Sequence, residues 1–281
     1  ADAKGMRLIA GKVLMDSNCP EELRDDAETG YADSKALIER WHGKGRLGYA
    51  ITPRFALTSS AEQLAAAGRL ASEYPDVWIH THLAENMEEV DEIARLFPDS
   101  RSYLDVYEQH GLLRERAVFA HCLHMDDEDR ASMSVHGGAA AFCPTSNLFL
   151  GSGLFDLPAF RDAGIRCGLG TDVGGGTSLS LLKTASEAYK VLHLQEHALP
   201  ATRALYLATL GAAEALYLDD RIGNFASGKE ADFVVLDFEG SNLTARRTAA
   251  ATTIEEKLFA LITLADDRNV AATYVNGVKV Q

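Results

Sequence analysis

Cysteine, tryptophan and long apolar runs are scarce in this sequence of 281 residues, which has four cysteines and two tryptophans. No two cysteines form a C-x-x-C pair, so neither a zinc ribbon nor a thioredoxin-type dithiol is supported. No apolar run approaches the roughly 20 residues that span a bilayer, and no charged-then-apolar leader opens the sequence. Cys122, Cys143 and Cys167 lie in apolar runs, which is typical of buried, reduced thiols. We therefore expect a cytoplasmic protein.

Positive charge is also scarce. The 27 lysines and arginines are outnumbered by 41 aspartates and glutamates, so the formal net charge is −14 and the sequence pI is about 5.1. Such a surface repels phosphate backbones and anionic lipid headgroups. We therefore expect no nucleic-acid partner and no membrane partner. The apolar share of 47% is ordinary for a globular chain.

Short apolar runs that alternate with helical stretches organise the first two thirds of the chain. Runs that are apolar nearly throughout are typical of parallel strands covered on both faces, and their alternation with helices indicates βα units. The pattern favours a (β/α)₈ barrel over an open doubly wound sheet, although six strands are two short of a barrel. The six runs are residues 7–15, 47–51, 77–83, 117–122, 139–143 and 165–170.

The last part of the chain has a different character. Residues 179–218 are expected to be helical with a break near Pro200, and glycines punctuate short strands after Arg221. A terminal strand pair over 271–280 is expected to turn at Asn276-Gly277. We therefore predict a barrel domain over 1–220 and a β-rich unit over 221–281.

Four polar side chains lie at the ends of three different strand runs, at the same predicted edge of the sheet. His82 and Glu85 follow the third run, His121 ends the fourth and Asp172 follows the sixth. Because the carboxyl ends of parallel strands form the site in such folds, these residues are expected to converge. Two histidines and an aspartate suit a catalytic zinc, and Glu85 would remain as a proton shuttle. The alternative is that each is a separate polar group at a strand end.

Several nearby features carry alternatives. His80 shares a strand face with His82 and could be a ligand or a packed neighbour, of which we favour the neighbour; His124 has the same ambiguity. His193 and His197 match an H-x-x-E-H pattern, for which a solvated helix end is favoured over a metal site. The glycines from 168 to 176 miss the phosphate-loop spacing, and we expect them to let the backbone approach a ligand or a metal. The H-x-E with P-C-x-x-C deaminase pattern is absent.

Several short motifs occur in a fixed order along essentially the whole chain. They are Thr81-His82-Leu83-Ala84-Glu85-Asn86, Ala120-His121-Cys122, Gly168-Leu169-Gly170-Thr171-Asp172 and the tail from Ile222 to Asp232, together with Thr52-Pro53-Arg54-Phe55, Cys143-Pro144-Thr145-Ser146-Asn147-Leu148 and Asp266-Asp267-Arg268-Asn269. No single motif is specific, but their joint order is. By the first four motifs the sequence resembles the amidohydrolase superfamily, and by the last three it resembles, within that superfamily, the guanine deaminases.

The resemblance implies an α/β fold, a (β/α)₈ TIM barrel of which strands 3–8 lie here, with strands of a small β-sandwich. It also implies one zinc per chain, with iron as the other metal that such ligands accept, and a homodimer. The implied reaction is hydrolysis of guanine to xanthine and ammonia. The family begins with an H-x-H strand that nothing before His80 supplies. We therefore expect this chain to be the C-terminal portion of a longer enzyme.

The resemblance also implies roles for individual residues. His82, His121 and Asp172 would bind the metal, and His121 would count among the catalytic residues. Asp172 would take a proton from the attacking water, and Glu85 would carry a proton to a ring nitrogen. Arg54 and Phe55 would grip the purine together with His82 and Glu85, since a guanidinium can donate two hydrogen bonds to guanine and an aromatic ring can stack on it.

Other functions remain open at this point. The same fold and metal could act on an adenosine-type nucleoside or an s-triazine, against which Arg54 and Phe55 argue. A purine-binding module without a metal would lack catalytic activity altogether. A doubly wound nucleotide-binding protein is disfavoured by the failed glycine spacing.

Overall fold

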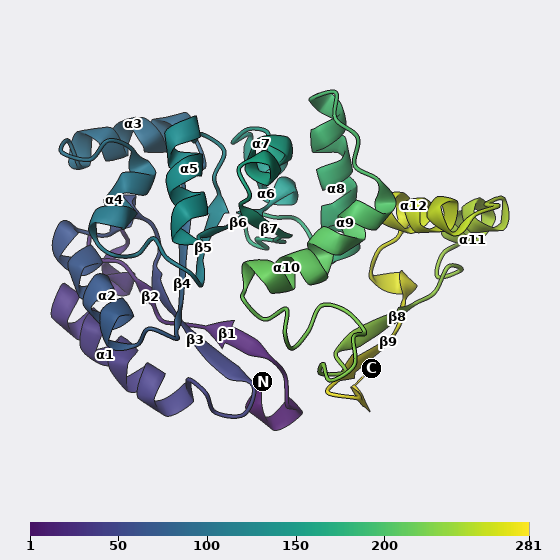
Figure 1. The fold of residues 1–281 in the computed structure, drawn as a ribbon, viewed down its shortest axis with the longest axis horizontal. Coiled ribbons are helices and arrows are strands. Elements are labelled where there is room, and N and C mark those ends of the chain that lie inside the picture. The colour runs from purple at the N-terminus through teal and green to yellow at the C-terminus, as the bar shows by residue number, and fades with distance from the viewer. Residues whose placement is uncertain (281) are drawn as a thin grey trace. The chain divides into compact units, whose positions relative to one another are not determined.

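A parallel sheet carries His82 and His121 at the carboxyl ends of two neighbouring strands. The computed structural model describes residues 1–280, and Figure 1 shows their ribbon. The strands follow the order β1-β3-β4-β5-β6-β7, and β2 also pairs with β3. Their bounds are β1 (Leu8–Ala10), β2 (Val13–Leu14), β3 (Leu47–Pro53), β4 (Trp78–Leu83), β5 (Ala117–His121), β6 (Ala139–Phe142) and β7 (Arg166–Leu169). The predicted α/β class with parallel strands is confirmed, and most of the predicted strands begin and end within two residues of the observed ones.

Helices connect these strands, as the alternating pattern predicts. The α-helices of the chain are α1 (Ala27–Trp41), α2 (Ala61–Glu73), α3 (Met87–Leu96), α4 (Tyr103–Gln109), α5 (Asp127–His136), α6 (Pro144–Leu150), α7 (Leu157–Asp162), α8 (Leu181–Leu194), α9 (Ala201–Ala208), α10 (Leu210–Ala215), α11 (Asn242–Ala249) and α12 (Ile254–Leu264). Residues 1–280 also contain four 3₁₀ turns: η1 (Asp2–Lys4), η2 (Glu21–Leu23), η3 (Ala56–Thr58) and η4 (Asp267–Asn269).

The first predicted strand, over 7–15, is interrupted in the structure. A Cβ at Gly11 would lie 1.7 Å from the carbonyl oxygen of Ala50, so only glycine allows the backbone this close to β3. The next amide, that of Lys12, donates to the Tyr49 hydroxyl (3.1 Å) instead of joining the ladder. The prediction of one continuous strand was therefore wrong at this point, because a single close approach divides it into β1 and β2.

The described chain divides into two compact units, and each is considered by itself. The first comprises residues 1–140 and 160–165. In it α1 and α2 pack side by side next to β3 (Figure 1). The fully buried side chains of Ile51, Leu64, Leu70 and Ile79 form the core between these helices and the strands. This core holds the carboxyl ends of β3, β4 and β5 in register, with Leu83 opposite His121.

The second unit comprises residues 141–159 and the described chain from 166 onward. Its three-stranded antiparallel sheet has the order β10-β9-β8, with β8 (Phe233–Leu236), β9 (Val270–Val275) and β10 (Val278–Lys279). Asn276 and Gly277 both have positive φ, which confirms the predicted turn. Two helices, α11 and α12, come between β8 and β9 in the sequence, lie side by side and were not predicted (Figure 1). The domain boundary at 220/221 stays a prediction.

No described helix combines the length and the apolar character needed to cross a bilayer. All four cysteines are free thiols, and Cys122, Cys143 and Cys167 are buried, as their apolar sequence context predicts.

Candidate metal centre and substrate site

His82 lies near the carboxyl end of β4, where its ring orientation is set by the neighbouring strand. Its backbone N–H and its ring Nδ1 both contact the carbonyl oxygen of Arg54, at 3.2 and 2.7 Å. A carbonyl oxygen can only accept, so Nδ1 carries the proton. In the neutral imidazole the second nitrogen, Nε2, therefore keeps its lone pair, which is the form that can bind a metal.

His121 is the last residue of the next strand, β5, and is completely buried. Its ring stacks on that of His82, with centroids 5.3 Å apart and planes 25° apart. Its Nε2 lies 3.6 Å from Oε2 of Glu85. Two imidazoles and one carboxylate are thus brought together at the ends of β4 and β5.

Left-handed backbone is concentrated at these motifs. Ala84 has φ of 48°, His121 of 74°, Cys122 of 54° and Asp172 of 44°. Residues other than glycine adopt such angles at a cost of order 1–3 kcal/mol, and these angles cluster at functional sites. Two of these four residues, His121 and Asp172, belong to the group of neighbouring His and Asp side chains described below.

Asp172 is placed by the loop that follows β7. The hydroxyl of Thr145 in α6 donates to the Thr171 carbonyl oxygen (3.1 Å), and the Gly176 N–H donates to the Asp172 carbonyl oxygen (2.5 Å). The expectation that the glycines face a ligand is corrected at Gly168, because a Cβ there would lie 2.8 Å from the Cα of Ala212. Close packing of α10 against β7 explains this glycine.

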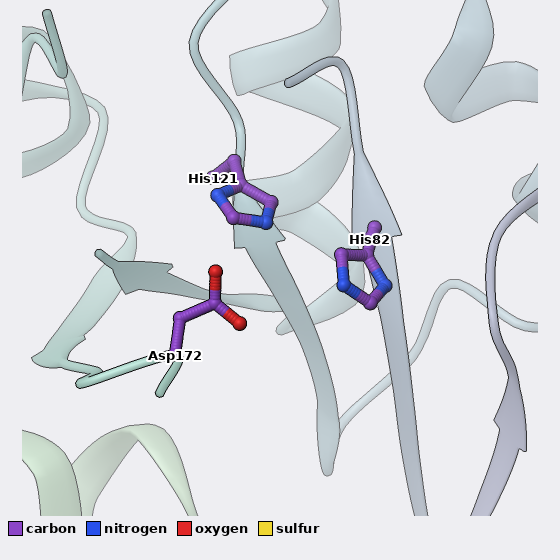
Figure 2. A group of neighbouring side chains, drawn as sticks. All are labelled: His82, His121 and Asp172. Atoms are coloured by element: carbon purple, nitrogen blue, oxygen red, sulfur yellow. The ribbon is translucent and has the colours of Figure 1, made fainter. Parts of the chain in front are cut away.

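The structure brings together three of the residues that the sequence singled out. Each offers a ligand atom, and these atoms all lie within 4.8 Å of one another (Figure 2). Two imidazoles with a carboxylate form a donor set that suits a catalytic divalent metal, so the residues fit the group that the sequence implied. The three are His82, His121 and Asp172. Their role as ligands stays a prediction.

His80, His124, His193 and His197 lie outside this group. His80 is exposed, although it is on the same strand as His82. Helix α8 ends at Leu194, so His193 is in its last turn and His197 lies beyond it. The H-x-x-E-H pattern therefore does not place two histidines on one helix face.

Arg54 and Phe55 follow β3 directly and lie next to His82. The guanidinium carbon of Arg54, an exposed residue, is 4.7 Å from the centroid of the Phe55 ring. That ring is 5.8 Å from the imidazole of His82. A cation, an aromatic face and a histidine thus form a continuous row, an arrangement suited to a flat heteroaromatic ligand. The predicted binding role of these residues stays a prediction.

Tyr107 is a buried residue of this site that sequence reasoning missed. Its hydroxyl donates to the His82 carbonyl oxygen (2.8 Å) and accepts from the Ala56 N–H (3.0 Å) and the Thr81 hydroxyl (3.1 Å). Burial raises the pKa of Tyr107, so the phenol stays protonated and remains a donor. An aromatic residue at helical spacing is typical of core packing, so the sequence carried no signal for this role.

Replacing Tyr107 with Phe should lower the free energy of unfolding by about 1–3 kcal/mol, because it removes the hydroxyl that three buried groups share. Urea unfolding followed by circular dichroism measures this. Tyr31→Phe is the matched control, since its hydroxyl contacts Glu73 at the surface and its loss should change stability by less than about 0.5 kcal/mol. Equal stability of the two variants would contradict the bracing role of Tyr107.

Comparison with known proteins places the chain among related sequences and structures. The model of the amidohydrolase family matches residues 1–280. Guanine deaminase of Escherichia coli (strain K12) is 54% identical over 272 residues, which cover 97% of this chain and 62% of that protein. The chain thus spans less than two thirds of the length of this relative.

Solved structures show the same likeness. E. coli guanine deaminase matches with a TM-score of 0.99 and 53% identity, covering 100% of this chain and 66% of that one. A guanine deaminase from C. acetobutylicum, solved with guanine in its active site, matches with a TM-score of 0.90 and 29% identity, covering 100% and 67%. These matches confirm the predicted fold and the resemblance to the amidohydrolases and guanine deaminases.

Proposed function

The chain belongs to the amidohydrolase family, and from this membership we propose that it carries out the hydrolytic deamination of guanine to xanthine and ammonia. The observation that carries the proposal is the 54% identity to a guanine deaminase over nearly the whole of this chain. The polar residues at the ends of β3, β4 and β5, together with Asp172, supply groups that such a reaction needs.

Binding of the metal would depend on His82 Nε2, on His121 and on the Asp172 carboxylate. We propose zinc as the metal, one per chain, with iron as the alternative for this donor set. A bound divalent metal supplies a water that is nucleophilic at neutral pH. The contact of His82 Nδ1 with the Arg54 carbonyl oxygen favours the tautomer with the proton on Nδ1, which leaves the lone pair of Nε2 for the metal.

Side chains of this protein would bind the purine and transfer the protons. Arg54 and Phe55 would hold the purine by hydrogen bonds and by stacking, beside His82. The Asp172 carboxylate would accept a proton from the attacking water. Glu85, whose Oε2 lies 3.6 Å from His121 Nε2, would deliver a proton to a ring nitrogen as C2 becomes tetrahedral. The proton held by Asp172 would pass to the exocyclic amine, which would leave as ammonia, and the proton of the new C2 hydroxyl would return to Glu85 as xanthine forms.

The direct test is ammonia release from guanine by the zinc-supplied protein, compared with release from an adenosine-type nucleoside and from an amino-s-triazine. We expect guanine to give the highest kcat/KM, and elemental analysis to find zinc. Faster release of ammonia from one of the other two compounds would identify that compound, and not guanine, as the substrate. Zinc-free protein that binds purine without releasing ammonia would favour a binding module instead.

Arg54→Ala should lower kcat/KM for guanine by about 10- to 100-fold, because one good bidentate contact to a base contributes about 1–3 kcal/mol. The carbonyl oxygen that holds His82 belongs to the backbone and remains, so metal content should not change. Arg161→Ala is the control, since Arg161 is exposed and pairs with Asp162. Steady-state kinetics measure the effect. If Arg54→Ala keeps the wild-type kcat/KM for guanine, Arg54 does not bind the substrate.

We further propose that the protein is a cytoplasmic homodimer. Four free thiols and the absence of a C-x-x-C pair support a reducing compartment. The family resemblance supports the dimer, for which mass measurement by light scattering is the test.

A further inference from the structure

Glu89, in the first turn of α3, is a buried carboxylate that the proposed reaction does not use. It is only 5% exposed. Both of its oxygens accept hydrogen bonds: Oε1 from the Tyr103 hydroxyl (2.6 Å) and Oε2 from the backbone N–H of Glu85 (3.2 Å). Burial raises the pKa of Glu89, because an environment with little water disfavours the charged carboxylate. A buried acid of this kind calls for a reason other than packing.

Capping of the helix accounts for only part of this arrangement. Asn86 is the N-cap of α3, and its side chain accepts the N–H of Glu89 (2.9 Å). In a capping box the third residue would return its side chain to the N–H of the cap itself. Glu89 instead reaches the N–H of Glu85, one residue before the cap. The contact therefore holds the residue whose side chain faces His121.

The backbone on the other side of Glu85 is held as well. Ala84 adopts a left-handed φ of 48°, and its carbonyl oxygen accepts the N–H groups of Leu123 and His124, at 3.0 and 3.2 Å. The peptide between Ala84 and Glu85 is thus held on both sides. Leu123 and His124, which follow β5, bind its carbonyl oxygen, and the Glu89 carboxylate binds its N–H. Rotation of this peptide would swing the Glu85 carboxyl away from its position 3.6 Å from His121.

We propose that Glu89 is a positioning residue, which fixes the Glu85 carboxyl toward His121 by accepting the Glu85 backbone N–H. The inference deepens the proposed function, on which the catalytic role of Glu85 rests. Helix α4 supports both ends of this motif: Tyr103 holds Glu89, while Tyr107, stacked on Tyr103 at 5.7 Å, holds the His82 carbonyl oxygen.

Three variants separate positioning from simple stability. Glu89→Leu removes the acceptor for the Glu85 N–H, Glu89→Gln keeps a carbonyl oxygen there, and Tyr103→Phe removes a hydrogen bond of Glu89 without touching Glu85. We expect Glu89→Leu to lower kcat by about 10- to 100-fold with little change in KM, since small misplacements of catalytic groups cost factors of this size. Glu89→Gln and Tyr103→Phe should keep kcat within about threefold of the wild type, although Tyr103→Phe lowers the melting temperature.

The proposal is overturned if Glu89→Leu keeps kcat, if Glu89→Gln loses as much as Glu89→Leu, or if kcat falls in Tyr103→Phe as far as in Glu89→Leu. The second outcome would assign the effect to the charge of Glu89, and the third to general loosening of the fold.

A second readout does not depend on turnover. Amide hydrogen exchange at Glu85 should become at least about tenfold faster in Glu89→Leu and stay protected in Glu89→Gln. Should the wild type release no ammonia from guanine, the proposed function fails, and exchange alone still decides whether Glu89 holds Glu85. Unchanged exchange in Glu89→Leu would rule that contact out.

Discussion

Replacing Glu85 with Gln should lower kcat for guanine by about 10³-fold while zinc content stays unchanged. Gln has nearly the same shape but cannot give up or take up a proton, and a positioned general acid–base group contributes about 10²- to 10⁴-fold. Glu85 is not one of the three residues whose ligand atoms lie within 4.8 Å of one another, so the metal should remain. Ammonia release and elemental analysis on the same preparation measure both quantities.

Glu88→Gln is the matched control for this experiment. Glu88 is three residues further along, exposed in the first turn of α3, and carries the same charge. It should retain full turnover. If Glu85→Gln turned over guanine within a few fold of the wild type, another group would have to move the proton, and the assignment of Glu85 would be lost.

Replacing His121 with Asn should remove both the bound metal and the turnover. His121 is completely buried and has φ of 74°, and asparagine is among the residues that tolerate this left-handed conformation. The fold should therefore survive while one imidazole ligand is lost. Loss of groups that merely support a ligand weakens metal affinity by about 10- to 100-fold, and loss of the ligand itself should exceed that. Competition with a chromophoric chelator measures the affinity.

His124→Asn provides the comparison, because His124 lies three residues away and outside the group of three. Its backbone N–H, which binds the Ala84 carbonyl oxygen, is unaffected by the substitution. Metal affinity should stay within about threefold of the wild type, as expected of a residue beyond the metal's immediate supporting shell. A loss equal to that of His121→Asn would make His124 a ligand and would overturn the preference for a packed neighbour.

Much of the site was predictable because parallel strands end at one edge. His82 and His121 could be placed there from two apolar runs alone, since the register of β4 and β5 brings their last residues opposite each other. Asp172 followed from the same rule at β7. The start of α3 at Asn86 is a local feature of the same kind, because the Asn86 side chain caps an N–H only three residues away.

Other features could not be predicted because they depend on residues far apart in the sequence. The break at Gly11 is caused by the Ala50 carbonyl oxygen, and the tautomer of His82 by the Arg54 carbonyl oxygen. Helices α11 and α12 were missed within a segment whose glycines and short strands indicated only a sheet.

By itself, the sequence determined the alternation of strands and helices, the strand-end positions of His82, His121 and Asp172, and the family to which the chain belongs. These are local patterns, since periodicity and motif order are carried by neighbouring residues. Only the tertiary structure decided what holds those side chains. Tyr107 reaches His82 across 25 residues and Tyr103 reaches Glu89 across 14, and such hydrogen bonds exist only once burial has packed α3 and α4 against the strand ends.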